Sequence, residues 1–420
     1  MAKSDIGIGV DVGTGKAVVA VGQIKDNVIN IVGLGKATNS GMRKGVVSDI
    51  EEVISAVSTA AEEAERMAGF PLASATLGIG GGQVQAVESK GVIAVSRADG
   101  EITDVDVNRA IDSTKNIPLP PNQEILEVIP QLYIVDGQTE TNDPTGMSGI
   151  RLETKSLIIS GPSVAIKNLV KCVNQAGLEV IDMVFTPLTT AEILLTKKQK
   201  ELGTAMIDIG SGTTSLTVFE EGKLIHTAIL PIGSLHLTND IAIGLRIGIE
   251  AAEKVKLKYT SARSDDINEN DQIDLSKLDP NNKEKVSRKY VSEIVEARLS
   301  EIFNLLRDEL KKIGKDGMLP GGVVLTGGGS QLNNLTEMVK KDLRLPAQIG
   351  LPAIEVSGIV DKLDDPVYTA AIGIMMASLK EKREGKWSKG LTSWGNLDRL
   401  SDGWRRPIGQ VKNIFKHFLP

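Results

Sequence analysis

The start of the chain alternates between apolar runs and short glycine-rich turns. Residues 6–12 (IGIGVDV) and 17–22 (AVVAVG) are mostly apolar, and residues 13–16 (GTGK) separate them. Apolar runs on both sides of a short turn that contains glycine predict a β-hairpin. Residues 29–37 (INIVGLGKA) continue the apolar pattern and predict a third strand beside it.

The hairpin pattern recurs near the middle of the chain, in residues 205–219 (AMIDIGSGTTSLTVF). Each copy has an apolar run, an aspartate, one apolar residue, Gly-x-Gly and a second apolar run. Asp11 aligns with Asp208, Gly13 with Gly210 and Gly15 with Gly212. Self-similarity of this kind predicts an internally duplicated α/β protein, whose two lobes meet at their glycine turns.

The remaining pattern predicts further strands and helices. Strands are expected within residues 75–85, 125–137, 154–161 and 180–185, helices within 49–69, 104–116, 162–177, 234–260 and 291–314, and a strand, turn and helix within 321–341. Ser48 and Glu51 have capping-box spacing before the first helix, and Ser330 or Asn333 is the expected N-cap of the last. The polar residues 261–285 are expected either to form a surface loop or to be partly disordered.

Composition narrows the class of protein. The 420 residues are 41% apolar and 24% charged, which is typical of a soluble protein with two or three domains. A net charge of −6 argues against a general nucleic-acid binder. The single Cys172 excludes an internal disulfide, and the three scattered histidines do not suggest a zinc site. Without a signal-peptide pattern or an apolar run of about 18 residues, a cytoplasmic protein is expected.

The paired turns suggest a phosphate site, although neither fits G-x-x-x-x-G-K-[ST] or G-x-G-x-x-G. Glycine lets backbone N–H groups approach phosphate oxygens closely, and Lys16 supplies a cation. Uncharged hydroxyl donors come from Thr14, Ser211, Thr213 and Thr214. Asp11 and Asp208 precede the turns, where two carboxylates could hold a hydrated Mg²⁺ beside the phosphates of a nucleotide. One such hairpin alone would be an ordinary turn; two together favour ATP.

A third glycine-rich stretch follows a buried-type strand. It consists of Thr326, Gly327, Gly328, Gly329 and Ser330 and precedes a predicted helix. Glycines here let the backbone lie flat against a ribose or purine, and a helix N-terminus favours phosphate. Glu253 and Lys256 lie three residues apart on one helix face, where they could reach ribose hydroxyls or form a surface ion pair.

The end of the chain (GWRRPIGQVKNIFKHFLP) predicts an amphipathic helix. Its apolar stripe, at steps of three and four residues, is Trp404, Ile408, Val411, Ile414, Phe415, Phe418 and Leu419. The flanking cations are Arg405, Arg406, Lys412 and Lys416. Such a helix is typical of an anionic membrane interface, although it could also dock on the body of the protein. Because one helix of this size binds weakly, self-assembly would strengthen binding through avidity.

Several stretches match the pattern of a known family. Two D-x-G-x-G hairpins, the T-G-G-G turn and DDPVYTAAIG (364–373), in this order, resemble the superfamily of actin, heat-shock chaperones and sugar kinases. SGMRKGVVSDIEE, LEVIPQLYIVDG, DPTGMSGIRLE, TNDIAIGLRIGIEAAEKVK and VVLTGGGSQL more specifically resemble the bacterial cell-division family FtsA, from about residue 5 to 378. This resemblance implies an actin-like (ribonuclease H-like), two-lobe duplicated α/β fold with an inserted α+β subdomain and a C-terminal amphipathic helix.

The resemblance also implies boundaries and site residues. The implied units are the first lobe (1–83 and 163–200), the insert (84–162), the second lobe (201–380) with a helical subdomain at about 233–318, a linker (381–403) and the membrane helix (404–420). The first phosphate loop would be Asp11, Gly13, Thr14, Gly15 and Lys16. The second would be Asp208, Gly210, Gly212, Thr213 and Thr214, and Gly327–Ser330 would be the adenosine loop.

The implied function is an ATP- and Mg-binding protein that forms actin-like filaments on the inner face of the cell membrane at the division site. It would anchor the tubulin-like protein FtsZ and help recruit later division proteins. The FtsZ tail would dock near Arg288, Lys289 and Arg298, which could equally be solvated helix charges. No residue is identified that positions a water, so hydrolysis stays open. The alternatives are a sugar or carboxylate kinase of the same superfamily, or a scaffold like the pilus-assembly protein PilM.

Overall fold

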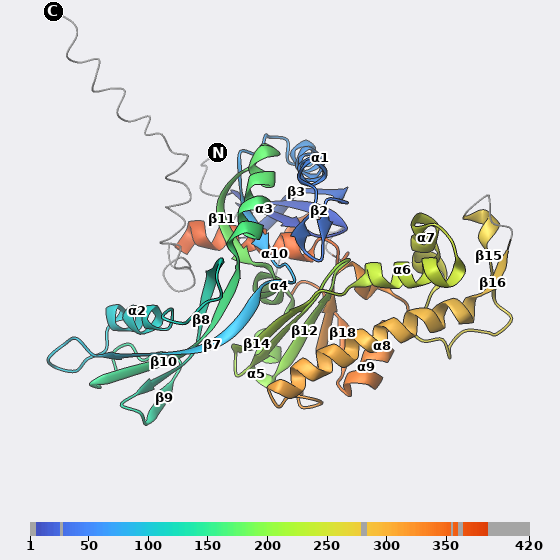
Figure 1. Ribbon diagram of the computed structural model, residues 1–420. Helices are drawn as coiled ribbons and strands as arrows, with labels where there is room; N and C mark the ends of the chain where they lie inside the picture. The colour runs from blue at the N-terminus through green and yellow to red at the C-terminus, as the bar shows by residue number, and fades with distance from the viewer. Residues whose placement is uncertain (1–5, 26–27, 279–283, 354–355, 360–363, 385–420) are drawn as a thin grey trace, which may run out of the picture.

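A computed structural model describes residues 6–25, 28–278, 284–353, 356–359 and 364–384 (Figure 1). The first lobe is built on a six-stranded sheet with the order β11-β6-β1-β2-β3-β19. Its strands are β1 (Ile6–Val12), β2 (Lys16–Lys25), β3 (Val28–Thr38), β6 (Ser74–Ile79), β11 (Glu179–Phe185) and β19 (Val356–Gly358). The first hairpin and the third strand are therefore confirmed: β1, β2 and β3 pair antiparallel in sequence.

The second lobe repeats this arrangement. Its sheet has the order β14-β13-β12-β17-β18, formed by β12 (Thr204–Ile209), β13 (Thr214–Glu220), β14 (Lys223–Leu230), β17 (Val323–Thr326) and β18 (Ala347–Ile349). In both lobes a three-stranded antiparallel meander is extended by two parallel strands on the side of its first strand. The shared strand order confirms the duplication that the repeated hairpin predicts.

Helices cover both faces of the first-lobe sheet. Gly35 of β3 lies against α1 (Ile50–Ala68), where an added Cβ would be 1.8 Å from the Ala60 carbonyl oxygen. Gly9 of β1 lies against α10 (Thr369–Glu384), where an added Cβ would be 2.3 Å from the Met375 nitrogen. Gly35 is paired with Val19 of β2, and Gly9 is paired with Ala20 of the same strand. Consecutive residues of a strand point to opposite faces of the sheet, so the two glycines face opposite sides. The two helices therefore sandwich the sheet.

An inserted unit follows β6. Its four-stranded sheet has the order β7-β10-β8-β9, with β7 (Gln85–Ala94), β8 (Gln123–Val135), β9 (Thr139–Thr141) and β10 (Arg151–Pro162), and α2 (Asp104–Ser113) packs on it. The face of the sheet toward α2 has a core of its own, whereas Leu126, Ile129, Leu157 and Ile159 of β8 and β10 belong to the first-lobe core. The side-chain nitrogen of Gln131 in β8 donates to the carbonyls of Leu224 (2.9 Å) and Ile225 (3.3 Å) in β14. The insert, anchored in the first lobe, therefore also contacts the second (Figure 1).

The second lobe carries α6 (Ser234–Leu245) and α7 (Ile249–Tyr259) on the side away from the insert, and α8 (Arg288–Lys312) runs from that side along the second-lobe sheet (Figure 1). Further elements are β4 (Met42–Arg43), β5 (Val46–Val47), α3 (Ser163–Gln175), α4 (Thr186–Leu194), α5 (Lys197–Leu202), η3 (Gly328–Gln331) and α9 (Leu335–Leu343). No described helix has the length and apolarity that crossing a membrane requires.

Residues 261–278 correct the expectation of a loose surface loop. β15 (Gln272–Asp274) pairs antiparallel with β16 (Lys285–Ser287), and η2 (Leu275–Lys277) follows it. Ala262, Ile273 and Leu275 are buried in the second-lobe core. Sparse apolar residues in a polar segment suffice here, because helices distant in sequence already supply the surface against which they pack.

Two predicted helix starts are also wrong. α1 begins one residue later than the capping box suggests: Asp49 is the N-cap and its carboxylate accepts from the N–H groups of Glu51 and Glu52, while the Ser48 hydroxyl donates to the Gly41 carbonyl. The helix after the third glycine turn begins at Leu335, with Asn334 as N-cap, because η3 intervenes. Its N-terminus therefore does not follow the turn directly.

Candidate functional site

The two hairpin turns have the same local geometry. The Gly13 N–H donates to the Lys16 carbonyl at 2.9 Å, and the Gly210 N–H donates to the Thr213 carbonyl at 2.9 Å. Each turn thus closes between the glycine two residues after the aspartate and the residue three positions further along the chain. This equivalence follows from the repeated Gly-x-Gly pattern.

The tips of the two turns touch. An added Cβ on Gly15 would lie 2.8 Å from Ser211 Oγ, and one on Gly212 would lie 2.5 Å from Thr14 Oγ1. Side chains do not fit at either glycine, so glycine is what permits the approach. The structure thereby brings together residues that are almost 200 positions apart, as the repeat predicts.

The third glycine turn joins them at the same place. Strands β12 and β17 run parallel with Asp208 opposite Thr326, so the turn after Thr326 begins beside Asp208. An added Cβ on Gly327 (φ +81°) would lie 2.1 Å from Asp208 Oδ1, and one on Gly328 would lie 3.3 Å from Lys16 Nζ. Asp208 and Lys16 therefore occupy the point where all three glycine stretches converge.

N–H groups behind each hairpin turn donate to the carbonyl groups of the turn and hold them away from the point where the three glycine stretches converge. The Asn39 side-chain amide donates to the Gly13 carbonyl at 2.8 Å, and the Asn39 N–H donates to the Gly15 carbonyl at 3.1 Å. In the second lobe the first two N–H groups of α6 do the same, from Ser234 to Gly210 and from Leu235 to Ser211. Carbonyl oxygens would repel an anion. Because these oxygens are held back by their own donors, the space between the turns favours anion binding. The sequence pattern missed Asn39, which has no spacing signal relative to the turns.

The charged side chains at the centre have shifted pKa values. Burial raises the pKa of Asp11 to about 7, repulsion by Asp208 adds to this, and Lys16 opposes it. Burial raises the pKa of Asp208 to about 6, again opposed by Lys16. Burial and the nearby Lys36 lower the pKa of the Lys16 ammonium. Both carboxylates are thus disfavoured in their charged forms, and a bound cation would reverse this.

This donor set fits Mg²⁺ together with a phosphate ligand. Among the described residues no group of three or more His, Cys, Asp or Glu side chains is placed to hold a metal. A site with two carboxylates suits Mg²⁺, which usually binds one or two carboxylates with waters and substrate phosphates completing its shell. Asp11 and Asp208 would hold such an ion, and Lys16 would face the phosphates.

Other predicted site residues have different surroundings. Thr213 closes the second turn through its carbonyl and is partly exposed, like Ser211. Thr214 is fully buried and its hydroxyl donates to the Ile232 carbonyl at 2.8 Å, so it supports the turn from behind. The Thr214 hydroxyl therefore stabilises the turn, and it is already engaged by the Ile232 carbonyl where a phosphate contact was predicted.

Glu253 and Lys256 form the ion pair that was the alternative to ribose binding. Lys256 Nζ lies 2.7 Å from Glu253 Oε2 and donates to the Thr238 hydroxyl at 2.9 Å. Lys256 is buried, and burial lowers its pKa while Glu253 opposes this. Glu253 is partly exposed and close enough to Lys16 for its charge to oppose the lowering of the Lys16 pKa. Glu253 therefore borders the site, whereas Lys256 braces α7 against α6.

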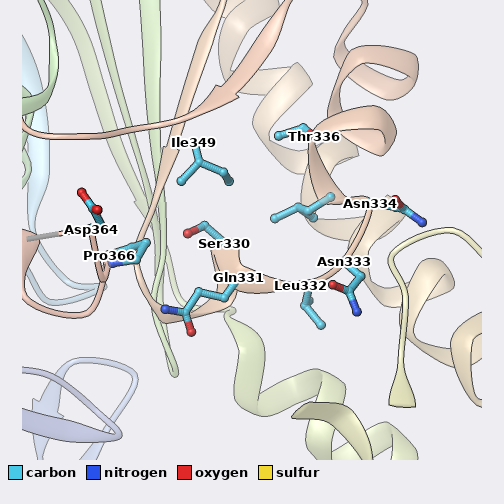
Figure 2. A pocket seen from close by; sticks show the side chains of 10 residues that line it. Ser330, Gln331, Leu332, Asn333, Asn334, Thr336, Ile349, Asp364 and Pro366 are labelled. Carbon is cyan, nitrogen blue, oxygen red and sulfur yellow. The ribbon is translucent and has the colours of Figure 1, made fainter. Parts of the chain in front are cut away.

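A pocket of about 430 Å³ lies beyond the third turn. Ser330 and Gln331 line it from the turn, Asn333 from the segment before α9, Ile349 from β18 and Asp364 from the opposite loop (Figure 2). The Gln331 amide donates to Asp365 at 2.8 Å. The pocket combines apolar and hydrogen-bonding groups, and it is lined by Ser330 and Gln331 of the same short helix that contains Gly328, so a group attached to phosphates at the turns could reach it.

The predicted partner-binding cations of α8 all have partners within the chain. Arg298 donates two hydrogen bonds to Asp240 of α6, at 2.6 and 3.0 Å. Arg288 donates to the Tyr259 carbonyl and to Asp271, and Lys289 lies 2.7 Å from Glu269. The predicted linker, residues 381–403, is wrong in its first four positions, because α10 continues to Glu384. Its remaining residues 385–403 and the predicted membrane helix, residues 404–420, lie outside the described residues.

The duplicated sheets and converging turns define an actin-like fold. Solved structures share it: a PilM-PilN type IV pilus biogenesis complex (TM-score 0.64, 15% identity, 89% of this chain and 98% of that chain) and MreB5 of Spiroplasma citri bound to ADP (TM-score 0.54, 15% identity, 91% and 98%). The predicted actin-like fold is confirmed.

Closer relatives identify the family. The model for cell division protein FtsA matches residues 205–373, and the model for the SHS2 domain inserted in FtsA matches residues 81–160. Cell division protein FtsA of Neisseria meningitidis is 37% identical (88% of this chain, 89% of the relative), and that of Pseudomonas aeruginosa is 35% identical (90% of both). The chain belongs to the FtsA family of cell division proteins.

Proposed function

We propose that this division protein binds ATP with Mg²⁺ between its two lobes. The observation that carries this proposal is the meeting of three glycine turns around Asp208 and Lys16. Thr14, Ser211 and the backbone N–H groups of the two hairpin turns would bind the phosphates. The ribose and base would extend along Gly327–Ser330 into the pocket beside Gln331. Glu253, at the border of the site, would face the ribose.

Within the family role, we propose that ATP acts mainly as a clamp. A ligand that contacts both hairpin turns binds the closed arrangement of the lobes better than an open one, so it shifts the population toward closure. The closed form would assemble into actin-like filaments. We name no residue that positions an attacking water, because the site geometry accounts for binding alone.

Anchoring of FtsZ at the inner face of the membrane completes the proposal. The tail from Trp404 to Leu419 would bind anionic lipid, and later division proteins would join the array. The acidic FtsZ tail would compete with Asp240, Glu269 and Asp271 for the cations of α8. Exposed apolar groups lie there too: Ile243 is 76% exposed and Tyr290 is 48% exposed. Both border the contact of Gly244 with α8.

Co-sedimentation with vesicles tests this role. The full chain, MgATP and anionic vesicles should carry FtsZ into the pellet, whereas a chain truncated after residue 403 should leave FtsZ in solution. FtsZ without its C-terminal tail and neutral vesicles are the controls. Unchanged pelleting of FtsZ by the truncated chain would contradict the proposed membrane anchor.

A further inference from the structure

The first hairpin turn contacts a second, smaller hairpin. Strands β4 and β5 pair antiparallel, and the turn between them, which we call the ribbon tip, is Lys44-Gly45. Both residues have positive φ, +52° and +77°. The Gly45 N–H donates to Thr14 Oγ1 at 3.0 Å. The ribbon tip therefore rests on the same hydroxyl that touches Gly212 of the second lobe.

The ribbon tip in turn contacts the root of the insert. The Gly82 N–H donates to the Lys44 carbonyl at 3.2 Å, and an added Cβ on Gly81 would lie 2.6 Å from the Gly45 carbonyl oxygen. Gly81 and Gly82 stand between β6 and β7, where the match to the inserted SHS2 domain begins. The insert thus starts on the ribbon tip.

The root of the insert then contacts the second lobe and closes a ring. An added Cβ on Gly82 would lie 3.2 Å from Pro231 Cβ, and one on Gly233 would lie 2.6 Å from the Gly210 carbonyl oxygen. The ring runs from Thr14 through the ribbon tip, the insert root and the 231–233 loop to the second hairpin turn, which touches Thr14 again. Three of its contacts are between backbones, and the other three involve only the short side chains of Thr14 and Pro231, so no long flexible side chain absorbs a displacement.

We propose that this ring couples the nucleotide turns to the insert. A phosphate that enters between the turns must displace Thr14 from Gly212, and Thr14 carries the ribbon tip and the insert root with it. The inference rests on the proposed nucleotide site and assigns its regulation. By linkage, any partner that holds the insert in one orientation changes nucleotide affinity by the same factor as the nucleotide changes partner affinity.

Hydrogen exchange measured by mass spectrometry on the full chain tests the coupling. In the wild type, exchange of β7 should differ between the MgATP and MgADP states. In Gly81→Ala the new Cβ clashes with the Gly45 carbonyl, so that difference should shrink by about fivefold or more. Fivefold is the lower end of the range over which coupled sites typically change each other's affinity. MgATP should still slow exchange in residues 8–22. Gly80→Ala is the matched control, since its nearest neighbour, Thr186 Cβ, is 3.3 Å away.

The outcomes separate the coupling from the nucleotide site itself. A β7 difference that persists in full in Gly81→Ala, or that is missing in the wild type while residues 8–22 respond, overturns the coupling and leaves nucleotide binding intact. No response of residues 8–22 in the wild type overturns both. Should Gly81→Ala fail to fold, Pro231→Gly breaks the ring on the other side without adding atoms, and the same loss of the β7 difference is expected.

Discussion

At the scale of single residues, burial decides which side chains carry chemistry. Asp11, Asp208 and Lys16 are charged groups held where burial disfavours their charges, and they face one another at the meeting of the turns. Lys256 is buried as well, but it is matched by Glu253 and Thr238. An unmatched set of charges favours a ligand, whereas a matched pair favours stability.

Glu127 provides a test of buried carboxyls away from the site. Burial raises its pKa to about 8, and repulsion by Asp182 adds to this. The folded state therefore holds a proton that the unfolded chain releases above about pH 4.5, so this group makes the protein lose stability as the pH rises toward 8. In Glu127→Gln the slope of unfolding free energy between pH 5 and 8 should be shallower by up to about 1.4 kcal/mol per pH unit.

Urea titrations at several pH values measure that slope. The difference between variant and wild type should grow with pH, in favour of the variant at pH 8. The same slope in both proteins would show that Glu127 ionises normally.

Asn39 is expected to support the first turn. Its side chain, 3% exposed, donates to the Gly13 carbonyl and accepts from the Gly41 N–H. Asn39→Ala should cost about 1–3 kcal/mol of stability, because the partly buried Gly13 carbonyl loses its donor. It should also weaken MgATP binding, as measured by calorimetry.

Asn268 offers a matched control for this substitution. It likewise accepts from the N–H two residues ahead, at 2.9 Å, but it is exposed and remote from the turns. Asn268→Ala should leave MgATP affinity unchanged. Equal effects of the two substitutions on affinity would refute a specific role for Asn39.

At the scale of elements, local patterns predict what local forces determine. The hairpins were predictable because apolar runs and glycine turns act within about 15 residues, and the repeat shows the same local pattern twice. The start of α9 was not, because the intervening 3₁₀ turn follows from contacts of Gly329 with Ile209 in another strand. Asn39 was equally hidden, since its partners depend on how β3 folds back beside the turn. Contacts between segments that are distant in sequence but lie within one lobe set these features.

The polar segment before α8 tests this view of elements. Ile273 in β15 is 1% exposed, so Ile273→Ala should destabilise the protein by about 2–5 kcal/mol. Ile243→Ala, at a 76% exposed position on α6, should change stability by less than about 0.5 kcal/mol. Thermal or urea unfolding compares the two. A negligible effect at Ile273 would show instead that residues 261–278 form the loose loop that their composition suggests.

At the scale of the whole molecule, two similar lobes supply one site. Neither hairpin binds a nucleotide convincingly alone, because each offers one aspartate and one set of turn amides. Their contact through Gly15, Ser211, Thr14 and Gly212 doubles the donors and pairs the carboxylates. Binding of the proposed nucleotide would therefore depend on how the two lobes are arranged.

The most direct measurement of this account is calorimetric ATP binding to a variant that carries both Asp11→Asn and Asp208→Asn. With Mg²⁺ present, ATP affinity should fall by about 100-fold or more, roughly 2.7 kcal/mol, because both carboxylates that hold the ion are gone. With the metal chelated, the variant should bind ATP at least as well as the wild type, since repulsion of the phosphates is removed. Unchanged MgATP affinity in a folded variant would contradict the central claim that the converging turns hold a magnesium nucleotide.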